Sequence, residues 1–291
     1  MRVKLFETLD DINNIIAKFV IKLFKFFIQQ FMTELKDGIF TPKTLEELKN
    51  KIDFSKKNDR ENWSCDLNEL NINEIKSEMF FNCKGLSKVM IPMGVTKIGK
   101  RAFQGCIGLT SIEIPESVTE ISSGAFIGCN GLKSIKVADG NKKYDSRDNC
   151  NAIIETAVNI LVCGCKTTVI PKSINRIGPW AFCGCTSLTS IVIPESVTCI
   201  GGWAFYNCKN LKAIDILGST ISIGISAIRR CIRLKSIVFP SRVTGILKGL
   251  LIECDELETI YVPANTVDYY IQRLSEKLHD KIKELNSVNK V

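Results

Sequence analysis

Histidine is nearly absent from this 291-residue chain, which has one, His279, beside thirteen cysteines. A cysteine nucleophile needs a base within reach, and His279 is distant in the sequence from every cysteine. The G-x-S-x-G, P-loop and G-x-G-x-x-G patterns are also missing. These absences leave an enzyme with little support, so we expect a non-enzymatic protein with no cofactor and no metal.

A secretory leader is not evident at the N-terminus either. Acidic side chains stand where a leader would be basic, at Glu7, Asp10 and Asp11. Lysines interrupt the apolar run of residues 1–31 too often for a membrane span, at Lys18, Lys22 and Lys25. We therefore expect a cytoplasmic protein, unless a leader precedes Met1.

A concentrated patch of positive charge is missing as well. The net charge of +8 is spread thinly along the chain, as is typical of a solvated surface. The densest basic group has no aromatic residues interleaved and consists of Arg229, Arg230, Arg233 and Lys235. Nucleic-acid binding is therefore not expected.

Residues 10–36 have apolar side chains at helical spacing, with three lysines on one face. This helix either packs on protein with its lysines in solvent or lies on an anionic membrane surface. Further on, Thr44 and Glu47 form a capping-box pattern that predicts a helix over 45–52. Residues 53–62 are polar and without period, so we interpret them as a linker.

From Asn68 onward the chain repeats one phrase, I-P-x-S-V-T-x-I-G-x-x-A-F-x-G-C-x-x-L-T-S-I-x, every 23 residues. A single longer unit, 137–169, interrupts the series. Units open at Asn68, Ile91, Ile114, Val137, Ile170, Ile193, Ile216 and Phe239, and a truncated one opens at Val262. A period of this length indicates a solenoid.

Within one unit, Ile112 and Ile114 alternate with Ser111 and Glu113, which predicts a strand with its isoleucines inward. Val118 and Ile121 mark a second, shorter extended piece. The segment G-x-x-A-F-x-G-C predicts a tight turn with perhaps one helical turn. One unit cannot bury its apolar side alone, but a stack of units can.

The cysteines largely follow the same period. One slot of the repeat is occupied by Cys83, Cys106, Cys129, Cys185, Cys208, Cys231 and Cys254. Because an odd count in a long chain is unlike a disulfide scaffold, we expect buried, reduced thiols. Cys163, Cys165, Cys183 and Cys185 together could also form a zinc set, although the repeat explains part of this pattern.

The phrases IPESVTEISSGAFIGCNGLKSI and IPESVTCIGGWAFYNCKNLKAI resemble the BspA-type leucine-rich repeat. The resemblance covers roughly residues 68–262. It implies an α/β leucine-rich-repeat solenoid of short parallel strands, used as a binding or adhesion module and often placed on microbial surfaces. It transfers no catalytic residue. Such a surface location remains open here beside the cytoplasmic expectation.

The longer unit predicts a β-hairpin: Ile153-Ile154 and residues 160–162 are extended, with a five-residue turn at 155–159. It should stand off the solenoid edge or widen one coil. Asp145, Asp148 and Asn149 lack calcium-loop spacing, so we interpret them as turn formers.

Residues 266–287 carry an apolar stripe that predicts a helix covering the last coil. We accordingly divide the chain into an N-terminal helical region and linker (1–62), a solenoid (63–265) and a C-terminal capping helix (266–291), so that helices cap both ends.

The outward strand positions are the candidate site, because repeat proteins bind through extended surfaces. They form two adjacent columns on the sheet, for which we name Ser111, Glu113, Ser134, Lys136, Ser190, Val192, Ala213, Asp215, Ser236, Val238, Thr259 and Tyr261. Lys88, Met90, Thr167 and Val169 continue the same columns. Trp180 and Trp203 share a slot and should stack; we favour a place in the core over a second exposed binding strip. The favoured function is protein binding or adhesion through this face. The alternative is a membrane-surface adaptor docked through residues 10–36.

Overall fold

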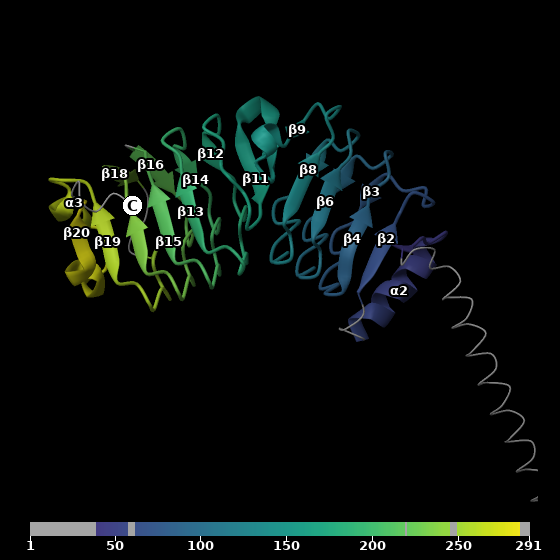
Figure 1. The fold of residues 1–291 in the computed structure, drawn as a ribbon, viewed down its shortest axis with the longest axis horizontal. Coiled ribbons are helices and arrows are strands. Elements are labelled where there is room, and N and C mark those ends of the chain that lie inside the picture. Colours follow the sequence, from purple (N-terminus) through teal and green to yellow (C-terminus); the bar gives the residue numbers. More distant parts are fainter. Residues whose placement is uncertain (1–38, 58–61, 219, 245–248, 286–291) are drawn as a thin grey trace, which may run out of the picture.

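The computed structural model describes residues 39–57, 62–218, 220–244 and 249–285. Over these residues the chain is a solenoid of stacked coils that follows an arc, from α2 (Leu45–Lys57) to β20 (Ile282–Glu284) (Figure 1). The predicted repeat solenoid is therefore confirmed. The helix predicted at 10–36, and the membrane docking that depends on it, lie outside the described residues. No helix within the described ranges is long and apolar enough to cross a bilayer.

The longer strands form two parallel sheets on one side of the coils, which we call the front. The N-terminal front sheet has the order β1 (Ile39–Phe40), β2 (Trp63–Asp66), β4 (Leu86–Met90), β6 (Ser111–Ile114), β8 (Ser134–Val137). The C-terminal front sheet has the order β13 (Ser190–Ile193), β15 (Ala213–Ile216), β17 (Ser236–Val238), β19 (Thr259–Val262), β20.

Shorter strands form the back of the coils. The first back sheet contains β3 (Glu74–Ile75), β5 (Lys97–Ile98) and β7 (Glu120–Ile121). The second runs through β9 (Tyr144–Asp145), β10 (Ala152–Glu155), β11 (Ile160–Gly164), β12 (Arg176–Ile177), β14 (Cys199–Ile200), β16 (Thr220–Ile223) and β18 (Arg242–Thr244). These short strands are the second extended pieces that Val118 and Ile121 predicted.

The 23-residue period sets the register of both front sheets. Ser111 pairs with Ser134, and Ile112 pairs with Ile135. Ile112 and Ile114 are buried, whereas Glu113 between them is exposed. Because side chains alternate along a strand, one repeat register places every coil's isoleucines in the core.

The G-x-x-A-F-x-G-C segments stack into what we call the turn column. It comprises residues 76–83, 99–106, 122–129, 178–185, 201–208 and 224–231. These segments contain turns rather than the helical turn considered from sequence. A Cβ on Gly99 would lie 2.5 Å from the backbone nitrogen of Ser77, so successive coils approach too closely there for any side chain.

Each turn passes twice through the left-handed region of backbone space. One set of positive-φ positions is Glu78, Arg101, Gly124, Trp180, Trp203 and Ser226, and the other is Asn82, Gly105, Gly128, Gly184, Asn207 and Arg230. The phenylalanines point inward from the same turns. Phe103 stacks between Phe80 and Phe126, with centroid distances of 5.2 and 5.3 Å.

The longer unit forms the predicted hairpin, β10 and β11, joined by residues 156–159, which include the 3-10 turn η3 (Thr156–Val158). It does not stand off the edge, since β11 pairs with β12 and extends the back sheet. Its side chains alternate between two hydrophobic cores. Ile153 and Cys163 belong to the N-terminal core, and Ala152, Ile154 and Leu161 belong to the C-terminal core. We call this hairpin the partition; Figure 1 places it midway along the arc.

Tyr144 closes the first back sheet where regular stacking stops. Its hydroxyl accepts a hydrogen bond from the Ile121 N–H at 3.0 Å. The adjoining 3-10 turn, η2 (Arg147–Asn149), leads into the partition. A side chain therefore takes the place of a strand partner at this edge.

At the N-terminal end, the Glu47 N–H donates to Thr44 Oγ1 at 3.2 Å, as the capping box predicted. The Glu47 carboxylate accepts from the Lys43 N–H instead of that of Thr44. The helix continues to Lys57, so the first part of the predicted linker is helical. The Lys51 ammonium lies over the Trp63 ring, which holds α2 against β2.

The helix predicted over 266–287 is wrong. The segment contains a short helix, α3 (Val267–Ile271), a 3-10 turn, η4 (Glu276–Lys281), and then β20. The strand β20 pairs in parallel with β19, joining Ile260 to Ile282. The open edge of β19 offers backbone partners that a helix would leave unused. Tyr270, Leu274 and Leu278 are still buried, so the apolar stripe has a core role without one continuous helix.

Candidate functional site: the front strand face

The twelve predicted site residues all lie on front strands, but on two sheets instead of one. Ser111, Glu113, Ser134 and Lys136 belong to the N-terminal front sheet, and the other eight belong to the C-terminal one. Thr167 and Val169 lie outside the strands, because the longer unit is taken up by the partition. The outward columns are therefore interrupted between β8 and β13.

The N-terminal front sheet presents charged side chains that pair with each other. Lys136 Nζ lies 3.6 Å from the Glu113 carboxylate on the neighbouring strand. Both side chains are more than 60% exposed, so water screens their attraction. A shallow hollow of about 420 Å³ beside this pair is lined partly by Met90 and Met93.

The C-terminal front sheet presents apolar side chains in the equivalent column. Val192 is 52% exposed, and Val169, next to it in the repeat, is 73% exposed. Val238 and Tyr261 continue the column in a half-buried state. The second outward column of this sheet has side chains that are small or carry a hydroxyl, namely Ser190, Ala213, Ser236 and Thr259. This surface has few groups that water must solvate, which favours contact with another apolar surface.

Asp215 is the one carboxylate in that apolar column. Burial raises the pKa of Asp215 above its ordinary value, because a charged form loses hydration there. No salt bridge to Asp215 occurs among the described residues. A cation brought by a partner would stabilise this carboxylate.

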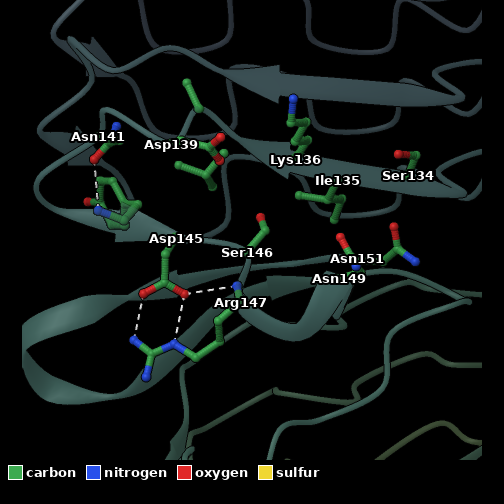
Figure 2. Close-up of a pocket in the computed structure, with 13 residues that line it drawn as sticks. Ser134, Ile135, Lys136, Asp139, Asn141, Asp145, Ser146, Arg147, Asn149 and Asn151 are labelled. Carbon is green, nitrogen blue, oxygen red and sulfur yellow. Dashed lines mark hydrogen bonds and ion pairs between the residues drawn. The ribbon is translucent and has the colours of Figure 1, made fainter.

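A second hollow, of about 440 Å³, lies where the N-terminal front sheet ends at β8. Figure 2 shows Asp145 held there by Arg147, whose Nε and Nη2 donate to the two carboxylate oxygens at 2.8 and 2.5 Å. Burial would raise the pKa of Asp145, but the hydrogen bonds from Arg147 and Thr156 together lower it. Asp148 and Asn149 have left-handed φ values. These residues thus serve the turn, as interpreted from the sequence.

The cysteine column is buried, and all thirteen thiols are free. Five Sγ–H groups donate to the carbonyl 26 residues earlier, at 3.0 to 3.2 Å, from Cys106, Cys129, Cys208, Cys231 and Cys254. Burial raises the pKa of Cys83 and Cys185 to about 11. Cys83 and Cys185 therefore stay protonated at neutral pH, and the five thiols that donate to a carbonyl join adjacent coils.

The zinc set considered from sequence gains no support from the geometry. No group of three or more His, Cys, Asp or Glu side chains is placed to hold a metal in the parts of the chain described. Burial raises the pKa of Cys183 to about 12 and that of Cys163 further, whereas zinc binds the thiolate. Cys165 Sγ contacts the Asn151 carbonyl oxygen at 3.5 Å.

The basic group at 229–235 is engaged within the solenoid. Arg229 and Arg230 both contact Glu253, at 2.6 and 3.0 Å. Arg233 donates to Asn210, and Lys235 pairs with Glu258. These pairs join successive coils, which reduces the positive charge open to a nucleic acid.

Trp180 and Trp203 stack with centroids 4.7 Å apart, as expected. Their expected place in the core is wrong, since both are half-buried. Their left-handed φ values direct the side chains out of the coil. Other coils have Glu78, Arg101 and Gly124 in the same slot. Charged residues there indicate an exposed position, which the sequence could have revealed.

Stacked coils with short parallel strands and period-23 hydrogen bonding define a leucine-rich-repeat solenoid. A family model, the BspA type leucine rich repeat region, matches residues 58–158 and 161–277 in 6 copies. These residues are most of the chain, so the protein belongs to the BspA-type leucine-rich repeat family.

Among solved structures, a leucine rich cell surface protein from Faecalibacterium prausnitzii is 30% identical, with a TM-score of 0.58. The similarity covers 77% of this chain and 60% of that one, so the chain spans less than two thirds of that protein. The pneumococcal vaccine antigen PcpA is 15% identical with a TM-score of 0.43, covering 77% and 79% of the two chains. No curated protein matches this chain in sequence.

Proposed function

We propose that this chain is a non-enzymatic module that binds another protein through its C-terminal front face, formed by β13, β15, β17 and β19. The observation that carries the proposal is an apolar column, with Val192 exposed and Val238 and Tyr261 half-buried, around one half-buried carboxylate, Asp215. Interfaces have such apolar centres with few charges.

The chemistry of the face suggests the chemistry of the partner. An apolar patch on the partner would cover the valines and Tyr261. A basic residue within that patch would lie against Asp215 and replace the hydration that burial removes. Membership of a leucine-rich repeat family supports protein interaction in general, and the F. prausnitzii relative, as a cell surface protein, supports adhesion as one use.

Charge placed on the small-residue column tests the proposal. We expect Ser190→Glu, Ser236→Glu and Thr259→Glu to weaken partner binding about 30-fold or more each, because a buried unpaired charge costs about 2 kcal/mol or more. The partner would first be identified by photo-crosslinking from position 192 in the intact protein, and affinities then measured by calorimetry.

The N-terminal front sheet provides matched controls at the same repeat slots. Ser111→Glu and Ser134→Glu carry the same added charge on the same kind of strand and should leave binding unchanged. Unaltered melting temperatures would show that all five variants are folded. Equal losses from both sheets, or none from the C-terminal one, would show that the face is assigned wrongly.

A further inference from the structure

The turn column continues directly past the partition. The unit 137–169 supplies no G-x-x-A-F-x-G-C turn, so the turn at 122–129 stacks on the one at 178–185. The Gly128 N–H donates to the Cys183 carbonyl at 2.9 Å. The Thr186 N–H donates to Asn130 Oδ1, although these residues are 56 apart. Two turns far apart in sequence thus form one continuous surface.

A hollow of about 730 Å³ lies over this junction. Its walls come from five coils, including Asn82, Gln104, Asn130, Trp180, Tyr206 and Lys209. Ligand sites in proteins commonly have volumes of about 300 to 1,000 Å³. The hollow is on the turn edge, away from the front face used in the proposed function.

The charges around the hollow are of one sign. Of the described residues, Lys100, Arg101 and Lys209 line it, and no carboxylate does. Arg101 has one acidic neighbour, Glu78, at 3.6 Å, with both side chains about half exposed. Such a pair is weak in water, so the guanidinium remains available to a stronger anion. The ligand should therefore carry negative charge.

Amide and hydroxyl groups fill the space between the cations. Ser122, Ser123 and Thr186 supply hydroxyls. Gln104 Oε1 and Asn207 Oδ1 are buried and have no hydrogen-bond partner among the residues that the structure describes. A buried acceptor without a partner costs about 1–3 kcal/mol. A ligand with several hydroxyl donors would supply what these two oxygens lack.

Two aromatic side chains complete the wall. Trp180 lines the hollow and is fixed by stacking on Trp203. Its φ of 63° follows from the repeat, which has a left-handed residue in this slot of every turn. Gly124 has the same slot in the neighbouring coil. Tyr206 adds a ring with a polar end.

We propose that this hollow binds an acidic oligosaccharide, a sugar chain bearing carboxylate or sulfate groups. The anionic groups pair with Lys100, Arg101 and Lys209, the sugar hydroxyls donate to the amide oxygens, and a ring face lies against Trp180. An acidic peptide or a single-stranded nucleic acid would satisfy the cations but offers fewer hydroxyl donors.

Binding of defined probes to the full chain tests the class of ligand. Calorimetry would compare trigalacturonic acid and a chondroitin sulfate tetrasaccharide with neutral galactotriose, hexaglutamate and hexathymidylate. We expect at least one of the two acidic sugars to bind at least tenfold more tightly than the other three probes. Equal binding of galactotriose, tighter binding of hexaglutamate or hexathymidylate, or no binding by either acidic sugar would overturn the proposal.

Matched variants test the place of binding. Lys209→Gln should weaken the acidic sugar about tenfold, since it removes one charge-assisted hydrogen bond. Lys172→Gln, at an exposed lysine outside the hollow, removes the same charge and should change nothing. Trp180→Gly, which keeps the backbone conformation that Gly124 has, should also weaken binding. Equal losses in the two lysine variants would mean unspecific attraction and contradict the assignment.

The front-face variants separate this site from the proposed function. Ser190→Glu should weaken protein binding yet leave sugar binding unchanged, and Lys209→Gln should weaken sugar binding yet leave protein binding unchanged. Loss of sugar binding in Ser190→Glu would show that the hollow is not an independent site.

Discussion

The two front sheets share one backbone design and differ in what they present to solvent. On the N-terminal sheet the outward column is charged, with Lys136 paired to Glu113. On the C-terminal sheet the same column is apolar, with Val192 half exposed and Asp215 unpaired by any described residue. The repeat constrains the inward side chains of every coil, because stacking leaves no room for variation there. The outward side chains are free, so two halves of one solenoid can have different surfaces.

The partition makes the contrast between halves possible. Ile153 faces the N-terminal core and Ile154, its neighbour, faces the C-terminal core. Neither half shares its front sheet with the other, so a substitution on one face has no strand through which to disturb the second. The largest expected effects are on stability, and they test whether the two cores unfold independently of each other.

Removing one stacked ring from each core should have the largest effect. Phe103→Ala and Phe205→Ala each delete a fully buried ring, at a cost of about 3–5 kcal/mol. Urea titration would measure that loss, and hydrogen exchange would locate it. If the halves are separate, Phe103→Ala lowers the protection of the Ile112 amide more than that of Ile214, and Phe205→Ala does the opposite. Equal loss at both amides would show one cooperative unit.

A smaller effect is expected in the cysteine column. Cys208 Sγ donates to the Phe182 carbonyl of the preceding coil at 3.1 Å, whereas Cys185 Sγ, next to the partition, pairs within its own coil with Ser187 Oγ at 3.9 Å. Cys208→Ala should therefore lower the free energy of unfolding by about 1 kcal/mol more than Cys185→Ala.

Chemical denaturation of both cysteine variants, under reducing conditions, measures that difference. Cys208→Ser serves as a control because a hydroxyl can still donate. Identical losses for the two alanine variants would show that the inter-coil thiol bond contributes nothing.

Breaking the ion pair of the N-terminal face should change stability by less than about 1 kcal/mol, since both partners are mostly exposed. Glu113→Gln tests this by thermal melting at low and high salt, and Lys136→Gln is its natural counterpart. A loss well above that limit would mean that this face is held by its charges more firmly than its exposure indicates.

The smallest effect is expected at Asp215, and it depends on pH. Burial raises its folded pKa above the unfolded value of 3.8, so the folded state binds a proton more readily. The penalty for the charged form is therefore present at neutral pH and disappears as the pH falls below the unfolded value.

Asp215→Asn should accordingly raise the melting temperature slightly at pH 7 and leave it unchanged near pH 3. The same variant should weaken protein binding at pH 7, because the partner's cation loses its carboxylate. Stabilisation together with tighter binding would contradict the role given to Asp215.

Much of the architecture was predictable from the sequence because the repeat is a strong local signal. The alternation around Ile112 and Ile114, the cysteine column and the hairpin at Ile153 all follow from spacing that no distant contact overrides. The C-terminal strand β20 was not predictable, because the apolar stripe through Leu274 and Leu278 is equally compatible with a helix. The strand β20 forms because its backbone can pair with the open edge of β19.

The outward strand positions of the candidate site were predictable, but their layout was not. Spacing identifies which side chains point outward, such as Ser190 and Asp215. It does not reveal that the partition separates β8 from β13, nor that the turns at Gly128 and Gly184 meet. Those facts depend on contacts between residues 56 apart, which no local pattern encodes.

The missing turn also contributes to the arc that the described coils follow. On the turn edge, the turns at 122–129 and 178–185 are in direct contact. At the back of the same two coils, the strands β9, β10 and β11 lie between β7 and β12. The turn edge therefore has fewer layers than the back of the stack, and it lies on the inside of the arc (Figure 1). The extra strands of the longer unit thus add width to the back of the stack at the partition, where the turn edge gains none.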